Sequence, residues 1–352
     1  MTPKQLNTTA RFPYAARNVP RGDFVGVQDL PTTPTPGDIV LATVEKIGKN
    51  SALELDNGRR CSLHAGDTIV AVFGNRYATM QFEGLARRTG DACDLLSMGG
   101  LCGIVQSKHG KVADPTTLRL LGGIADAHGR PLNLRDYGIK PMAGKTRPHV
   151  IVVCGSSMDA GKTYTAASII KGFNNAGKLV AGIKLTGTAT GKDTWSMLDS
   201  GACVALDFVD GGFPSTFLCG HDELMQLFDL LVGQAAACSA EYVVIEIADG
   251  LLQRETSMLL QSSAFTKDVD TWVFAGGDPM AAESGIRMMR NWGIEPVLIS
   301  GVLTMSPLNV REAELATGLS CRTARDLQSG ALTDLLDARS NLREVTVLRR
   351  TA

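Results

Sequence analysis

The fold of the second half of the chain is decided by one stretch, VIVVCGSSMDAGKTYTA at residues 150–166. Its first five residues are apolar and predict a buried strand, and Gly155 and Gly161 predict a tight loop after that strand. Lys162 and Thr163 then begin a segment of small residues that predicts a helix. A strand, a glycine-containing loop, Gly-Lys-Thr and a helix, in this order, predict a phosphate-binding loop.

Such a loop binds phosphate because its backbone N–H groups and the N-terminus of the helix point toward the anion. Lys162 would bridge phosphate oxygens and is a predicted catalytic residue, and the Thr163 hydroxyl would bind Mg²⁺. The alternative interpretation is a glycine-rich turn with a surface lysine. The residues predicted to bind nucleotide are Gly155, Ser156, Ser157, Met158, Asp159, Ala160, Gly161, Lys162, Thr163 and Tyr164.

The sequence around this loop, from residue 148 to the C-terminus, alternates apolar strand-like segments with helical patterns. The strand-like segments include LVAGIKL, VALDFVD, YVVIEIAD, TWVFAGG and PVLISGVLT. Continuous apolar strands that alternate with helices are typical of a parallel sheet covered on both faces. We therefore predict an α/β domain over 148–352, with any ligand beyond the carboxyl ends of its strands.

The first part of the chain has a different pattern. Six of the 14 prolines lie in residues 1–36, which predicts an extended arm. Residues 37–147 contain short apolar or alternating segments separated by glycine turns, which predicts a β-rich, barrel-like domain that ends in a polar linker at 126–147. The predicted fold class is thus α/β, with a mostly parallel domain that follows a β-rich one.

The composition narrows the classes of partner. Lys and Arg number 35 against 36 Asp and Glu, so the chain lacks the positive charge of a general nucleic-acid binder. The eight cysteines show no zinc-site spacing, and no apolar segment is long enough to span a membrane. We expect a cytoplasmic protein that binds a small-molecule substrate, with no nucleic acid and no membrane as partner. The aromatic residues of the arm would pack on the body or on a partner subunit, and we expect a homodimer or higher homo-oligomer.

Beyond the loop, predicted strands end at residues that suit phosphate chemistry. Lys184, Asp207 and Glu246 each lie at or near the carboxyl end of an apolar strand, and these ends meet along one edge of a parallel sheet. Lysines there would neutralise a polyphosphate, and carboxylates there would bind Mg²⁺. Polar residues after two of the strands are predicted to contact the substrate: Thr186, Thr188, Thr190, Asp207 and Asp210.

The loop also resembles a known family. Five residues separate Gly155 from Gly161, and this spacing is similar to that of dethiobiotin synthetase and its relatives among the P-loop NTPases. The resemblance covers about 150–310 and implies an ATP- and Mg²⁺-dependent enzyme. It implies that Lys184 is a catalytic lysine that reaches the phosphates, that Asp193 binds the metal with Thr163, and that Glu246 is both a metal ligand and catalytic. The glycines that follow the family's glutamate are absent here, so the family's substrate is not predicted.

A second resemblance concerns the segments after two strands. TGTATG at 186–191 and VALDFVDGG at 204–212 are similar to the C-terminal P-loop domain of a little-characterised family that includes proteins assigned as D-glutamate N-acetyltransferases. This resemblance implies the same fold and leaves acyl transfer open as an activity.

The sequence therefore favours an ATP- and Mg²⁺-dependent ligase or kinase that activates a carboxylate or an amine of a small metabolite, with GTP as an alternative nucleotide. Two other classes remain open. One is a nucleotide-hydrolysing switch or metallochaperone, and the other is an acyltransferase that uses the loop to hold a different phosphate-bearing ligand.

Overall fold

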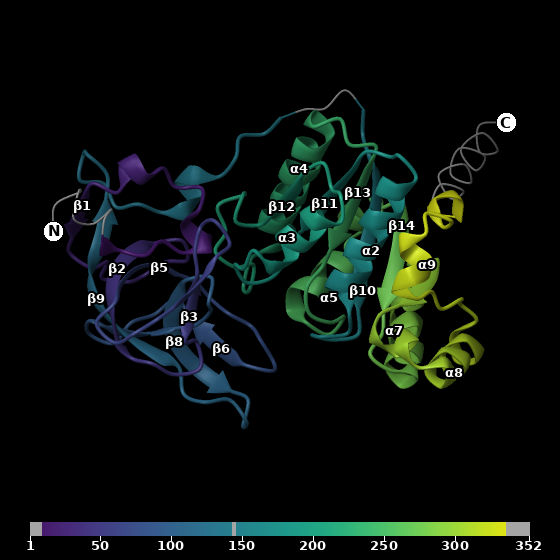
Figure 1. Cartoon of the computed structure of the whole chain (residues 1–352), viewed down its shortest axis with the longest axis horizontal. Coiled ribbons are helices and arrows are strands. Elements are labelled where there is room, and N and C mark those ends of the chain that lie inside the picture. The colour runs from purple at the N-terminus through teal and green to yellow at the C-terminus, as the bar shows by residue number, and fades with distance from the viewer. Residues whose placement is uncertain (1–8, 143–145, 336–352) are drawn as a thin grey trace. The chain divides into compact units, whose positions relative to one another are not determined.

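The computed structural model describes residues 9–142 and 146–335 (Figure 1). It divides into two compact units. Unit 1 comprises residues 1–140 with the segments 187–192 and 207–219, and unit 2 comprises 141–186, 193–206 and 220–352. Two short segments of the C-terminal half therefore belong to the N-terminal unit. The domain boundaries expected from the sequence stay a prediction.

Unit 1 is built mainly of strands, so the β-rich N-terminal half is confirmed. Five of them close a ring through the pairings β9–β2, β2–β5, β5–β8, β8–β7 and β7–β9, while β1 and β6 pair with β9 and β8 at the outside of the ring. The strands are β1 (Gly26–Gln28), β2 (Ile39–Lys46), β3 (Ala52–Glu54), β4 (Arg60–Ser62), β5 (Thr68–Phe73), β6 (Phe82–Leu85), β7 (Ala92–Leu95), β8 (Leu101–Lys108) and β9 (Thr116–Ala125).

The interior of the ring is apolar because alternate residues of each strand point inward. Val40, Ala42 and Val44 of β2 pack in one cluster with Leu118 and Leu120 of β9, and all five are buried. A two-stranded hairpin, β3 with β4, lies outside the ring pairing.

The proline-rich segment forms short elements that pack within unit 1. It contains two 3₁₀ helices, η1 (Tyr14–Ala16) and η2 (Arg21–Asp23), and a third, η3 (Leu134–Tyr137), follows β9. Phe12 and Phe24 are buried and meet edge to face, with ring centroids 4.8 Å apart.

Unit 2 contains a six-stranded sheet in the order β12-β11-β13-β10-β14-β15, and the pairings from β11 through β15 are parallel (Figure 1). The strands are β10 (His149–Gly155), β11 (Val180–Lys184), β12 (Ala205–Asp207), β13 (Tyr242–Glu246), β14 (Thr271–Ala275) and β15 (Leu298–Ser300). Residues 150–155 of the central strand β10 are all buried, so both faces of the sheet are covered. The predicted α/β class is confirmed.

Helices connect these strands. They are α2 (Lys162–Asn175), α3 (Lys192–Asp199), α4 (His221–Ala237), α5 (Arg254–Leu260), α6 (Ser263–Thr266), α7 (Pro279–Asn291), the 3₁₀ helix η4 (Val302–Met305), α8 (Pro307–Thr317) and α9 (Ala324–Gln328). The side chain of Asp278 accepts a hydrogen bond from the Ala281 N–H at 2.9 Å and so caps the start of α7.

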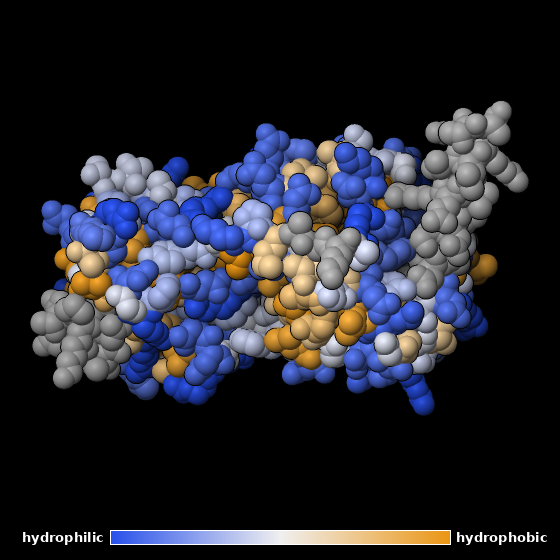
Figure 2. Space-filling view, turned by 90° about the horizontal axis from the view of Figure 1, so that it is seen from above, coloured by the Kyte–Doolittle hydropathy of each residue, from blue (hydrophilic) through white to orange (hydrophobic). Residues whose placement is uncertain are grey.

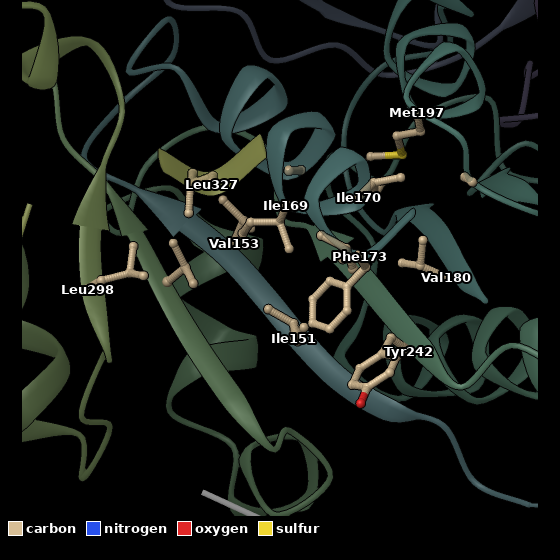
Figure 3. Packing of buried hydrophobic residues seen from close by; sticks show 14 residues of the cluster. Ile151, Val153, Ile169, Ile170, Phe173, Val180, Met197, Tyr242, Leu298 and Leu327 are labelled. Carbon is tan, nitrogen blue, oxygen red and sulfur yellow. The ribbon is translucent and has the colours of Figure 1, made fainter. Parts of the chain in front are cut away.

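The core of unit 2 lies where α2 packs against β10, β11, β13 and β14. Figure 3 shows Ile169 and Phe173 of α2 beside Val153 and Ile151 of β10, and all four side chains are buried. The Phe173 ring also stacks on Tyr242 of β13, with centroids 4.3 Å apart. This packing fixes the start of α2, and with it the phosphate loop, against the carboxyl ends of the strands.

Hydrophilic residues cover much of the face shown in Figure 2, with hydrophobic residues in smaller groups between them. Among the helices of the described residues, none is long and apolar enough to cross a membrane. All eight cysteines are free thiols; Cys203 and Cys238 are exposed, and the other six are buried or half-buried.

The packing of α2 on α9 generates a stability prediction. Replacing glycine by alanine inside a helix ordinarily stabilises it by about 0.5–1 kcal/mol. At Gly172, however, a Cβ would lie 2.1 Å from the Leu327 carbonyl oxygen, so α9 would have to shift. We expect Gly172→Ala to lower the melting temperature in thermal unfolding followed by circular dichroism. Lys171→Ala, one residue earlier, serves as the control and should change it little; a higher melting temperature for Gly172→Ala would contradict the packing.

Candidate nucleotide-binding site

The phosphate loop begins with a glycine that its surroundings require. Gly155 is the last residue of β10, and a Cβ there would lie 2.5 Å from the Ala275 carbonyl oxygen and 3.0 Å from Cγ of Lys162. At the other end, Gly161 has φ +94° and caps α2, and a Cβ there would lie 3.0 Å from Cα of Gly301. Only glycine meets both the left-handed backbone and the close approach at this second position.

Neighbouring strand ends hold the loop between these glycines. The Ser156 N–H donates to the Ala275 carbonyl at 3.0 Å, and the Val302 N–H donates to the Ala160 carbonyl at 3.0 Å. The Ser156 hydroxyl also accepts from the Gly277 N–H at 3.3 Å. The loop is therefore fixed by the ends of β14 and β15 before any ligand binds.

Lys162 is folded back over the loop that precedes it. Its side chain is buried, and its ammonium donates to the Ser157 carbonyl at 2.6 Å. Burial lowers the pKa of Lys162, and attraction to Glu246 offsets this only in part. A buried ammonium that donates to a neutral carbonyl favours the binding of an anion.

A second lysine, Lys184, is the last residue of β11, which is separated from β10 by β13 in the sheet. Its environment differs from that of Lys162. β11 and β13 pair in parallel with Lys184 opposite Glu246, and the Lys184 ammonium lies 2.5 Å from Oε1 of Glu246. It also lies 2.8 Å from Oδ2 of Asp193, at the start of α3. Burial by itself would lower the pKa of Lys184, but Asp193 and Glu246 outweigh it, so the pKa is raised. Lys184 therefore stays charged within a three-residue ion cluster.

Glu246 links this cluster to the loop. Its Oε1 accepts both from Lys184 and from the Thr163 hydroxyl, the latter at 2.8 Å. Its Oε2 is buried and has no hydrogen-bond partner among the described residues. An unpaired carboxylate oxygen of this kind is costly unless something else binds it.

These atoms fit Mg²⁺. The cation prefers oxygen ligands and is commonly held by a loop hydroxyl and one carboxylate, together with water and phosphate oxygens. Thr163 and Glu246 supply that hydroxyl and that carboxylate. Asp193, the third predicted ligand, pairs with Lys184, and its role as a ligand stays a prediction. No group of three or more His, Cys, Asp or Glu side chains in the described part of the chain is arranged to hold a metal by itself, so a metal here would depend on phosphate oxygens and water.

The remaining loop residues lie at the surface or partly so. Ser157, Asp159 and Tyr164 are exposed, and Met158 is half-buried. Asp159 has φ +62°, a left-handed backbone that turns the chain toward Ala160. All ten residues predicted to bind nucleotide thus form one continuous strand end, loop and helix start.

The residues predicted to contact substrate are divided between the two units. Thr186 belongs to unit 2, where its hydroxyl accepts from the Ala248 N–H at 2.8 Å. Thr188 and Thr190 belong to unit 1, where Thr188 pairs with Ser215 and the Thr190 hydroxyl donates to Glu54 at 2.9 Å. The hydroxyl groups of Thr186 and Thr190 are thus already used in folding, and Thr188 is held through its backbone.

Asp207 and Asp210 also belong to unit 1 and form a buried cluster there. Arg17 pairs with Asp207 at 2.7 Å and with Asp210 at 2.9 Å, and the Tyr14 hydroxyl donates to Asp207 at 2.7 Å. Burial and the nearby Asp207 raise the pKa of Asp210. The substrate role of these residues, like that of the three threonines, stays a prediction.

One residue beside the loop was missed by the sequence reasoning. Asp249 follows β13 with φ +60°, and burial raises the pKa of its carboxyl group. The signal that could have found it is the Asp-Gly pair three residues after a strand-terminal glutamate, in the place where the resemblance to dethiobiotin synthetase lacks its glycines.

The central strand of the parallel sheet runs into this loop and into α2, and Thr163, Lys184 and Glu246 meet at the strand ends. This arrangement defines the class of fold. Unit 2 has a P-loop NTPase fold. The finer likeness to dethiobiotin synthetase is not established by this geometry.

No protein-family model matches the chain, and no curated protein matches it. Among solved structures, the chain is similar to the signal recognition particle 54 kDa protein from Aeropyrum pernix K1 in complex with GDP. The two are 15% identical, the match covers 59% of this chain and 51% of that chain, and the TM-score is 0.36. The chain thus matches about half the length of that protein.

Two further structures are similar at a comparable level. A DUF1611 family protein from Anabaena variabilis ATCC 29413 has 15% identity, covers 59% of this chain and 63% of its own, and has a TM-score of 0.40. The cell division protein FtsY from Thermotoga maritima has 16% identity, covers 58% of this chain and 73% of its own, and has a TM-score of 0.37.

The opposite environments of the two lysines generate a prediction. Lys184→Met leaves Asp193 and Glu246 buried without their cation, which should destabilise unit 2 by about 3–5 kcal/mol. Lys162→Met removes a desolvated charge that has no carboxylate at hydrogen-bond distance among the described residues, so stability should be unchanged or higher. Chemical denaturation of both variants and of the wild type measures this difference. Equal losses of stability for the two variants would contradict the account of the site.

Proposed function

We propose that unit 2 binds a nucleoside triphosphate with Mg²⁺ at the phosphate loop and is an enzyme that transfers the terminal phosphoryl group to a small metabolite, of the kinase or ligase type. ATP is the expected nucleotide and GTP the alternative. The observation that carries the proposal is the unpaired Oε2 of Glu246, buried beside a carboxylate oxygen that already binds the Thr163 hydroxyl. This pair of residues is what a loop-bound Mg²⁺ requires.

The charges of the site support a metal requirement. Lys162 and Lys184 bring two positive charges, whereas Asp193, Glu246 and Asp249 bring three negative ones, so these five side chains sum to −1 at neutral pH. A polyphosphate would be repelled by that sum. A bound Mg²⁺ would supply the missing positive charge and neutralise phosphate oxygens.

Each residue then has a distinct task. The loop N–H groups and the N-terminus of α2 bind phosphate oxygens. Lys162 would exchange its bond to the Ser157 carbonyl for a phosphate oxygen, an exchange that returns a counter-charge to a desolvated ammonium. Lys184 orients Glu246 and Asp193 by pairing with both. Phosphoryl transfer needs mainly such positioning and electrostatic stabilisation.

A nucleotide titration tests the proposal. Full-length protein should melt at a higher temperature with ATP and Mg²⁺, because a ligand at 100 times its Kd stabilises the native state by about 2.7 kcal/mol. Lys162→Ala should abolish this shift and Lys171→Ala, on the same helix, should retain it. GTP in place of ATP decides the base preference. A Lys162→Ala protein that is folded and still shifts as the wild type does would reject the phosphate-loop assignment.

The metal assignment makes a separate prediction. Thr163→Ala removes one proposed Mg²⁺ ligand while the loop N–H groups remain, so we expect the Mg²⁺ concentration for half-maximal phosphate release to rise more than the Kd for the nucleotide. The check is a Mg²⁺ titration at saturating nucleotide. A metal response identical to that of the wild type would exclude Thr163 as a ligand.

The class of reaction follows from what accelerates turnover. A kinase or ligase should release nucleoside diphosphate rapidly only when a metabolite is added. Slow turnover that a protein partner stimulates would instead indicate a nucleotide-driven switch or metallochaperone, and acyl transfer without a nucleotide would indicate the acyltransferase class.

A further inference from the structure

The turn that follows β13 is bound at both ends to the strand that leads into the phosphate loop. The Ile247 N–H donates to the Val153 carbonyl at 3.0 Å, and the Leu251 N–H donates to the Gly155 carbonyl at 3.2 Å. Between them, a Cβ on Gly250 would lie 2.2 Å from the carbonyl oxygen of Ser156. The turn therefore packs directly on the start of the loop, with Asp249 at its middle.

The backbone of this turn is strained at Asp249. Asp249 has φ +60°, a conformation that aspartate tolerates better than most residues but that still costs free energy. The preceding residue is held on both sides, because the Ala248 N–H donates to Thr186 and the Ala248 carbonyl accepts from the Thr256 hydroxyl at 2.9 Å. Such strain is found most often at functional sites, where the surrounding structure enforces it.

The carboxylate of Asp249 has no part in holding this fold. It makes no hydrogen bond and no ion pair with any residue that the structure describes, although it is half-buried. Asp193, Asp207 and Asp278 are different, since each is bound to a lysine, an arginine or a helix N-terminus. Burial raises the pKa of Asp249, while Lys162 and Lys184 act in the opposite direction, which places it within the electrostatic reach of both lysines.

We propose that Asp249 is the catalytic residue that binds the attacking group of the phosphoryl acceptor and takes its proton, and that the acceptor therefore attacks through a hydroxyl or an amine rather than through a carboxylate. This inference rests on the proposed function. A carboxylate acceptor has no proton to give at neutral pH and would be repelled by Asp249, whereas an O–H or N–H group donates a hydrogen bond to it.

The step balances with a nucleoside triphosphate as the only co-reactant. The acceptor oxygen or nitrogen forms a bond to the terminal phosphorus as the bond from that phosphorus to the bridging oxygen breaks. The electron pair of the broken bond leaves with the nucleoside diphosphate, and the acceptor's proton passes to a carboxylate oxygen of Asp249. Because Asp249 is only half-buried, it can return that proton to solvent.

The test uses the full chain with Mg²⁺-ATP and measures phosphate release, with water as the attacking O–H group. Asp249→Asn keeps the shape and tolerates the same backbone, so nucleotide Kd and melting temperature should stay close to those of the wild type. The rate constant kcat should fall by about 10²–10⁴-fold, as expected for loss of a general base. Asp229→Asn on α4, where burial also raises the pKa of the carboxyl group, is the matched control and should retain kcat.

The pH profile separates catalysis from structure. Wild-type kcat should fall toward low pH as Asp249 becomes protonated, and this acid limb should be absent from the residual activity of Asp249→Asn. A panel of amines, alcohols and carboxylates should show transfer to the first two only. The proposal is overturned if Asp249→Asn keeps wild-type kcat, or if it loses nucleotide binding or stability instead. It is also overturned if carboxylates are phosphorylated as well as amines and alcohols are, or if bound nucleotide undergoes neither hydrolysis nor transfer. A wild-type protein that binds no nucleotide would be a failure of the proposed function itself.

Discussion

The site depends on one oxygen of Glu246, which accepts two hydrogen bonds. One comes from Lys184 on the adjacent strand and the other from Thr163 at the start of α2. The parallel register of β11 and β13 places Lys184 opposite Glu246, so sheet formation builds the pair. Because the Thr163 hydroxyl donates to the same oxygen, the sheet and the helix that follows the loop are held together at the strand ends. The second oxygen of Glu246 is buried and has no hydrogen-bond partner within 9–142 and 146–335.

That unpaired oxygen explains why the site is proposed to need a cation as well as an anion. The loop and Lys162 attract phosphate, while Asp193, Glu246 and Asp249 oppose it. Lys184 is already bound to two of these carboxylates and has little charge to spare for a ligand. A divalent metal held by Glu246 would satisfy both requirements. The charges of Lys184, Asp193 and Glu246 thus both stabilise the fold at the strand ends and create the proposed need for a metal.

The sequence predicted the α/β unit well because each signal was local: an apolar strand, a glycine-rich loop and a helix follow one another from 150 to 166. In the β-rich region the signals are weaker, because Gly122 and Gly123 interrupt the apolar pattern of β9, the longest strand of unit 1. A Cβ at Gly122 would lie 2.4 Å from the Gln28 carbonyl, so the glycine is required by β1, a contact that no local pattern reveals. Asp249 was missed for a related reason, since only the fold shows that its turn packs on the loop. The pairing of Asp207 with Arg17 likewise joins residues 190 positions apart.

The measurement that tests the central claim most directly is electron paramagnetic resonance of Mn²⁺, used in place of Mg²⁺, with the wild type and with Glu246→Gln. The account predicts that the wild type binds Mn²⁺ tightly only when a nucleoside triphosphate is present, because the metal needs phosphate oxygens in addition to Thr163 and Glu246. Glu246→Gln should lose this nucleotide-dependent signal while remaining folded. Equal Mn²⁺ binding by the two proteins in the presence of nucleotide would contradict the account.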